Sequence, residues 1–163
     1  QDASNMLEQM EREREKTTGT DPVRRTGDST KAAFFAKRRA TAAASLYRFF
    51  AAEYQRLYAT PYPDAPAPCV RLLKSAVKQT SSSAAHKAME LYWEEIRRIQ
   101  TDEWRGQEGP PHPGGKPTPT VRAFIARLAQ HMSANGKGYH QLIEQDRTAD
   151  AKAWTEHHGG LFQ

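Results

Sequence analysis

The stretch at residues 31–50, KAAFFAKRRATAAASLYRFF, holds seven alanines and four phenylalanines but neither glycine nor proline. Alanine has the highest intrinsic helix propensity, and its small side chain lets neighbouring helices pack closely. Apolar residues in this region recur at the spacing of one helix face, namely Phe35, Ala42, Leu46, Phe49, Phe50 and Leu57. We therefore predict a long core helix that begins near Ser29 or Thr30, either of which can cap it, and ends at about Ala59.

Proline and glycine divide the rest of the chain into further segments. A proline-rich turn, TPYPDAPAP, follows the first helix, and four glycines and four prolines make residues 102–118 a long loop. Thr118 and Pro119 then match an N-cap followed by proline at the first helical position. Between these breaks, apolar periodicity predicts helices at residues 69–80, 83–101, 119–134 and 139–154. No segment shows the alternating pattern of a strand, so the fold class is all-α, a compact bundle of four to six helices.

The predicted domain organisation has three parts. Residues 1–29 form a charged N-terminal arm, residues 30–155 a helical domain with the loop at 102–118, and residues 156–163 a tail. Glycines and aspartates break the arm before Ser29, and its apolar residues are Met6, Leu7 and Met10. We expect the arm to dock on a partner or to become ordered on binding.

Positive charge is concentrated in one part of the chain. The net charge is +5, and residues 22–80 carry eleven basic and three acidic groups. The helix at 69–80 places Arg71, Lys74 and Lys78 on one face and contains no acidic residue. Such a region attracts polyanions, and nucleic acid is the partner we expect. The candidate phosphate contacts are Arg24, Arg25, Lys31, Lys37, Arg38, Arg39, Arg48, Arg71, Lys74 and Lys78.

If six of these cations contact phosphates, affinity falls roughly a thousandfold over a fourfold rise in salt. No zinc-finger, RRM or KH pattern accompanies the basic region, and a helix-turn-helix stays open because its sequence signal assigns no recognition helix. DNA and RNA are both retained as partners.

Signatures of catalysis are weak. The histidines lack metal-site spacing, and the segment around Lys116 lacks the glycine and the Ser or Thr of a phosphate-binding loop. We expect no enzyme activity, no metal and no cofactor. An alternative hypothesis is a hydrolase that uses carboxylates of the loop Asp102–Lys116, which requires a cleft in which they converge.

The single cysteine, Cys69, excludes an intrachain disulfide and fits a reducing compartment. We interpret it as a small buried residue at a helix start. No apolar run approaches the roughly 18 residues of a membrane span, and no signal peptide is visible. A soluble, cytoplasmic protein without a membrane partner is expected. Because the chain begins at Gln1, we expect a start residue, leader or upstream segment beyond it.

Two resemblances support the nucleic-acid hypothesis. The order LYRFFAAEYQRLYATPY, CVRLLKSAV, AMELYWEEI and PTVRAFIARL, within Leu46 to Met132, resembles a helical module of phage-type replication and helicase-loading proteins. This resemblance implies a role in DNA replication, with contacts to DNA or to a replicative helicase, and it transfers no catalytic residue. The segment YHQLIEQDRTADAKAW, residues 139–154, is similar to a helix of the small subunit of CRISPR surveillance complexes. Those subunits are helical, basic and non-catalytic and line a nucleic-acid strand.

The sequence thus favours a non-catalytic nucleic-acid-binding accessory subunit of a larger assembly, with nucleic acid and protein subunits as partners. One alternative is a protein-interaction or structural subunit that does not touch nucleic acid, and another is the small subunit of an RNA-guided CRISPR-type complex.

Overall fold

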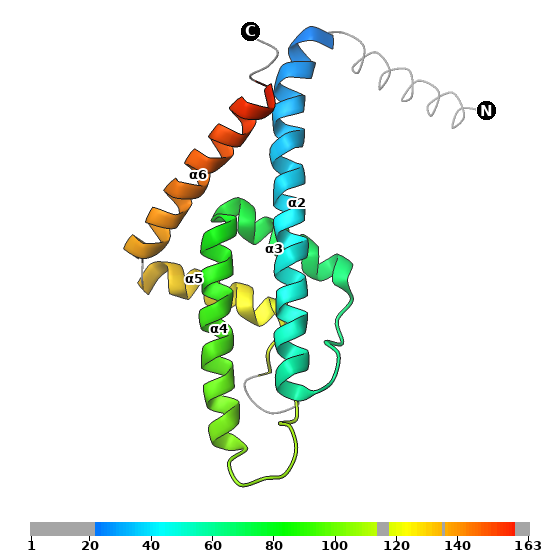
Figure 1. Ribbon diagram of the computed structural model, residues 1–163, viewed down its shortest axis with the longest axis vertical. Helices are drawn as coiled ribbons and strands as arrows, with labels where there is room; N and C mark the ends of the chain where they lie inside the picture. Colours follow the sequence, from blue (N-terminus) through cyan, green and yellow to red (C-terminus); the bar gives the residue numbers. More distant parts are fainter. Residues whose placement is uncertain (1–21, 114–117, 135, 159–163) are drawn as a thin grey trace, which may run out of the picture. The chain divides into compact units, whose positions relative to one another are not determined.

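The computed structural model describes residues 22–113, 118–134 and 136–158, and the side chains of 22–29, 133, 134 and 137 are not among those described (Figure 1). The described residues form five helices and no strand, which confirms the all-α fold class. The helices are α2 (Pro22–Tyr58), α3 (Pro66–Gln79), α4 (Ser82–Glu103), α5 (Val121–Ala134) and α6 (Gly136–His158). None of these described helices is both long enough and apolar enough to span a bilayer.

The chain divides within α2 into two units, Gln1–Ala36 and Lys37–Gln163. In the first unit the structure describes the helical stretch from Pro22 onward, where the rings of Phe34 and Phe35 meet edge to face at 5.4 Å. The predicted arm therefore lies largely outside the described residues.

The helix start predicted at Ser29 or Thr30 is wrong, since α2 already begins at Pro22. Proline is favoured in the first turn of a helix, where its missing N–H has no partner to lose. Gly27 then sits inside the helix at a cost of about 1 kcal/mol, which a long helix tolerates.

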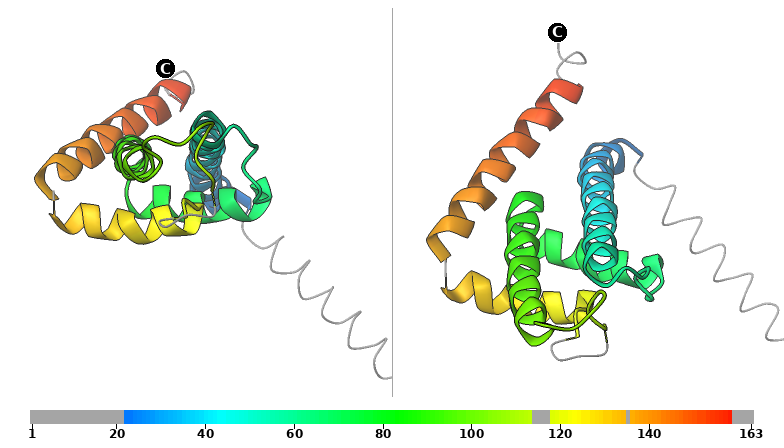
Figure 2. Two further views of the ribbon diagram at one scale, coloured as in Figure 1. Left: turned by 90° about the horizontal axis from the view of Figure 1, so that it is seen from below. Right: turned by 60° about the horizontal axis from the view of Figure 1, so that its bottom comes forward.

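The second unit is built in two layers. In the end-on view of Figure 2 (left), α2 and α4 point toward the viewer, and α3 and α5 run lengthwise beneath them. The helices α3 and α5 pack against each other, and α6 packs against α4 and α5. The outer side of the α3–α5 layer is therefore turned away from α2 and α4.

The core of the second unit is centred on an aromatic cluster around Phe50. Its ring lies 4.9 Å from Trp93, 5.1 Å from Tyr62 and 6.2 Å from Tyr92, measured between centroids. Phe50 and Trp93 are fully buried, as the helical spacing predicted. Phe35, expected to face the core, is only half-buried.

Polar groups fix α2 and α6 against α4. On α2, Glu53 is only 5 % exposed and accepts a hydrogen bond of 2.7 Å from Arg97 of α4. On α6, the Asp146 carboxylate accepts hydrogen bonds from the backbone N–H and the hydroxyl of Ser83, at 2.8 and 2.7 Å. Burial opposes ionisation of Asp146, but hydrogen bonds from Ser83 and Ser81 outweigh it and lower the pKa of Asp146 below its usual 3.8.

The start of α5 differs from the predicted start at Thr118 and Pro119. The helix begins at Val121, and the hydroxyl of Thr120 caps it by accepting from the N–H of Ala123 at 3.0 Å. Pro119 is instead one of the most deeply buried residues, so it serves the packing of the loop rather than the first helical turn. The backbone N–H of Val121 donates to the hydroxyl of Tyr62 at 3.1 Å.

Candidate nucleic-acid interface

The predicted phosphate contacts of α2 do not all lie on one face. The side chains of Arg24 and Arg25 are outside the described residues, and Lys31 is exposed in the first unit. Arg38 donates to Asp150 of α6 at 3.0 Å, so a carboxylate of the same chain already engages it. Arg39 stands eleven residues before Phe50, about three helical turns, and is half-buried on the inward side. We therefore remove Arg38 and Arg39 from the candidate phosphate contacts.

Two cations of α2 do point outward. Lys37 and Arg48 are both exposed and also stand eleven residues apart, so they share one side of the helix. That side lies roughly opposite Phe50, which is fully buried. Lys37 and Arg48 therefore form an outward pair on the upper layer of the second unit.

The three cations of α3 share the outward face of that helix. Arg71, Lys74 and Lys78 are exposed, whereas Leu73 and Val77, between them in sequence, are buried. Burial of the apolar residues thus fixes the direction of the cations. Arg71 also donates to the backbone oxygen of Ala67 at 3.5 Å. The face predicted from the spacing at i, i+3 and i+7 is present in the structure.

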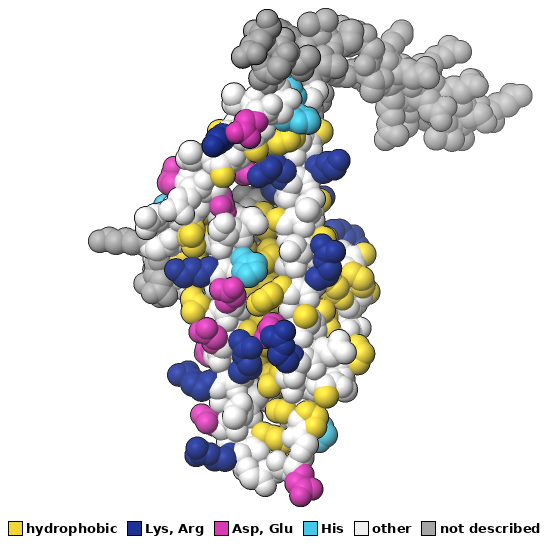
Figure 3. All heavy atoms as spheres, in the orientation of Figure 1, with side chains coloured by type: hydrophobic (Ala, Val, Ile, Leu, Met, Phe, Trp, Pro, Cys, Tyr) yellow, Lys and Arg dark blue, Asp and Glu magenta, His cyan; other side chains and the backbone are white. Residues whose placement is uncertain are grey.

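These outward cations, like Lys87 and Arg98 of α4, make no ion pair with a described carboxylate. Among the described residues, none of Lys37, Arg48, Arg71, Lys74 and Lys78 lies within 4.0 Å of a carboxylate oxygen. Elsewhere ion pairs are frequent, namely Arg97–Glu53, Arg127–Glu95, Arg147–Glu144 and Lys152–Glu156. Figure 3 shows positive and negative side chains intermixed along α4.

Helix α5 extends the cationic surface of α3. It carries Arg122 and Arg127 and, like α3, no acidic residue. Arg122 is exposed and stands two residues before the buried Phe124, so it points outward, and no described carboxylate pairs with it. We call the outward cations of this layer, Arg71, Lys74, Lys78 and Arg122, the α3–α5 basic face.

Arg122 is not among the cations predicted from sequence, since it lies outside the basic region at residues 22–80. The available signal was the absence of any Asp or Glu from residues 109–143. Conversely, α2 and α3 belong to different layers and cross each other (Figure 2). The structure therefore separates the predicted cations into the outward pair on α2 and the α3–α5 basic face.

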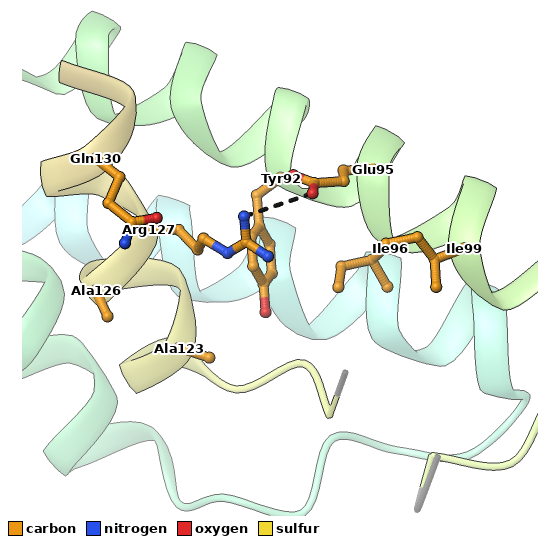
Figure 4. Close-up of a pocket in the computed structure, with 8 residues that line it drawn as sticks. All are labelled: Tyr92, Glu95, Ile96, Ile99, Ala123, Ala126, Arg127 and Gln130. Atoms are coloured by element: carbon orange, nitrogen blue, oxygen red, sulfur yellow. Dashed lines mark ion pairs between the residues drawn. The ribbon is translucent and has the colours of Figure 1, made fainter. Parts of the chain in front are cut away.

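A pocket of about 280 Å³ lies between α4 and α5. Ile96, Ile99, Ala123 and Ala126 form its apolar part, and Arg127 reaches across from α5 toward Glu95, at 3.5 Å, and Tyr92 (Figure 4). Burial raises the pKa of Tyr92 to about 12. Small-molecule sites usually measure roughly 300–1,000 Å³. Because the pocket is small and Glu95 engages its cation, we do not assign it a ligand.

The carboxylates of the hydrolase hypothesis are exposed, Asp102 and Glu103 at the end of α4 and Glu108 in the loop after it. None of them lines the pocket between α4 and α5, and Lys116 lies outside the described residues. Across the part of the chain that the structure describes, no three His, Cys, Asp or Glu side chains are grouped as a metal site would require. Cys69 is buried, and burial raises the pKa of its thiol, which keeps it protonated at neutral pH.

Comparison with known proteins adds no assignment. No family model, curated protein or solved structure matches the chain. The resemblances to replication proteins and to a CRISPR small subunit remain predictions from sequence. The functional interpretation therefore depends on the arrangement of charge.

Proposed function

We propose that the protein is a non-catalytic accessory module that binds the phosphate backbone of nucleic acid through its α3–α5 basic face. The observation that carries this proposal is the neighbouring pair of acid-free helices, on which four outward cations have no carboxylate partner among the described residues. Cations that lack an internal partner retain their full attraction for an external polyanion. On binding, these cations displace counterions from the phosphates, which supplies affinity without sequence readout.

The structure supports a preformed interface. Leu73, Ala76 and Val77 anchor α3 in the core, and Phe124 and Leu128 anchor α5. Side chains on anchored helices lose less conformational freedom on binding than side chains on a loop. Lys37 and Arg48 offer a second, smaller contact on the upper layer.

The test is fluorescence anisotropy of a labelled mixed-sequence nucleic acid, with the full chain titrated at several salt concentrations. The triple variant R71Q/K74Q/K78Q removes three cations of the face. We expect its affinity at low salt to fall at least about tenfold, and the slope of log affinity against log salt to become shallower by about 2 to 3.

The matched control is K87Q/R98Q/R105Q, which removes the same charge from exposed positions on α4 and the turn after it. If both triple variants weaken binding equally, net charge rather than the α3–α5 basic face is responsible, and the proposed interface is wrong. If the unmodified chain does not bind at low salt, the alternative of a pure protein-interaction subunit becomes the better account.

A further inference from the structure

The chemistry of the α3–α5 basic face also restricts the type of nucleic acid. Apart from the four cations of the face and Arg127, which pairs with Glu95, the exposed residues of these two helices are small or polar, for example Ser75, Ala126 and Gln130. The two helices contain two ring-bearing residues: Phe124 is 1 % exposed, and His131 is half-buried seven residues later on the same side of α5. The face therefore presents charge without a flat ring.

Elsewhere, the described Phe, Tyr and Trp rings are also at least partly covered. Among all described residues, every Phe, Tyr and Trp side chain is buried or half-buried. Proteins that hold single strands use aromatic side chains as stacking platforms for the unpaired bases, each contributing roughly 1–3 kcal/mol, together with a groove that follows the strand. The pocket between α4 and α5 is lined by none of the four cations of the face.

A double helix makes different demands. The bases of a duplex are already stacked on one another. A protein therefore gains most of its binding free energy from the two phosphate backbones, which together carry one charge per roughly 1.7 Å of axis. Arg71 and Lys78 are seven residues apart, which corresponds to about 10 Å along α3. Two anchored helices that hold cations at fixed spacing suit such a rigid and dense array of charge.

We infer that the α3–α5 basic face binds double-stranded nucleic acid in preference to single strands. This inference rests on the proposed function and goes beyond it by naming the form of the polyanion. DNA and RNA duplexes share the required phosphate chemistry, and the experiment distinguishes them.

The experiment measures anisotropy of the full chain with four probes of the same mixed sequence: a DNA duplex, an RNA duplex and one single strand of each. Probe concentrations are matched in phosphate, at one salt concentration. We expect at least one duplex to bind about tenfold more tightly than its single strand. R122Q and R71Q/K74Q/K78Q should each reduce this preference, and circular dichroism verifies that both variants fold.

Three outcomes separate the inference from the proposed function. Equal or tighter binding of the single strands overturns the duplex preference, while a selective loss in R71Q/K74Q/K78Q still supports phosphate binding by the face. Heparin that competes as effectively as the duplexes, at equal charge, also overturns the inference because the face then recognises charge alone. Absence of binding by every probe at low salt overturns both.

Discussion

At the scale of single residues, the tyrosine hydroxyls of the second unit fall into two groups. Tyr62 donates to Asp64 at 2.7 Å and accepts from the N–H of Val121 at 3.1 Å. The hydroxyls of Tyr58 and Tyr139 are buried without a hydrogen-bond partner among the described residues. A buried polar group that makes no hydrogen bond loses its hydration without compensation. The same chemical group thus stabilises the fold at one position and not at the others.

Removing the hydroxyl should destabilise the protein at Tyr62 but not at Tyr58. We expect Y62F to lower the free energy of unfolding by about 1–2 kcal/mol, because Val121 and Asp64 both lose a partner. Y58F should be neutral within about 0.5 kcal/mol or more stable than the parent, since no bond is lost. Urea denaturation followed by circular dichroism measures both. A loss in Y58F as large as that in Y62F would show that the Tyr58 hydroxyl is satisfied after all.

At the scale of elements, the contact between α2 and α4 combines apolar packing with one buried charge. Glu53 lies beneath the surface and accepts from Arg97 across the helix interface and from Arg56 on its own helix. A buried carboxylate is tolerated when its charge is paired and its oxygens are hydrogen-bonded. Removing one partner would leave the buried carboxylate poorly compensated.

The neighbouring arginines of α4 provide a matched test of this contact. R97M keeps the apolar stem but leaves Glu53 with Arg56 alone, and we expect a loss of about 2 kcal/mol in unfolding free energy. R98M changes an exposed residue that contacts no described carboxylate, so its effect should stay within about 0.5 kcal/mol. Urea denaturation measures the free energy of unfolding of both variants. Equal effects in the two variants would contradict the proposed role of Arg97.

The helices themselves could be predicted because their apolar periodicity is strong and prolines separate them. Positions such as Phe50, Leu73 and Trp93 follow helical spacing and are buried. Helix ends were less predictable. Several residues near a helix start can act as its cap, and tertiary packing determines which of them does. Thr118 and Thr120 are both good caps, and burial of Pro119 decides for Thr120.

The candidate site could be predicted only in part, for a related reason. Local spacing was enough to place Arg71, Lys74 and Lys78 together on one face. The pairing of Arg38 with Asp150 and the proximity of α5 to α3 depend on contacts between residues distant in sequence. Charge counted along the chain contains no information on which helix will lie beside which.

At the scale of the whole molecule, all six tyrosines share a raised pKa. Burial is the main cause in every case, and it takes the pKa of Tyr58 and Tyr92 to about 12 from the usual 10.0. Tyr62 is raised further, by burial and by its hydrogen bond to Asp64. The folded state therefore resists ionisation at all of these positions.

This shared shift predicts instability in alkali. Since each pKa is higher in the folded state than in the unfolded state, the stabilisation is fully present below pH 10 and is lost as the pH rises toward 12. The ultraviolet absorbance of tyrosinate should appear near pH 10 in urea-unfolded protein and only at higher pH in native protein. Native titration of all six tyrosines near pH 10 would contradict the buried arrangement.

The segregation of carboxylates from α3 and α5 has a kinetic consequence. Every described Asp and Glu side chain belongs to α2, α4, α6 or the loops beside them, and none to α3 or α5. Within the second unit, cations are in excess on α2, α3 and α5 and carboxylates on α4 and α6, so the unit has an electric dipole. The field of an approaching polyanion rotates such a dipole, so that its positive side faces the polyanion before contact. We therefore expect the association rate constant to rise as ionic strength falls.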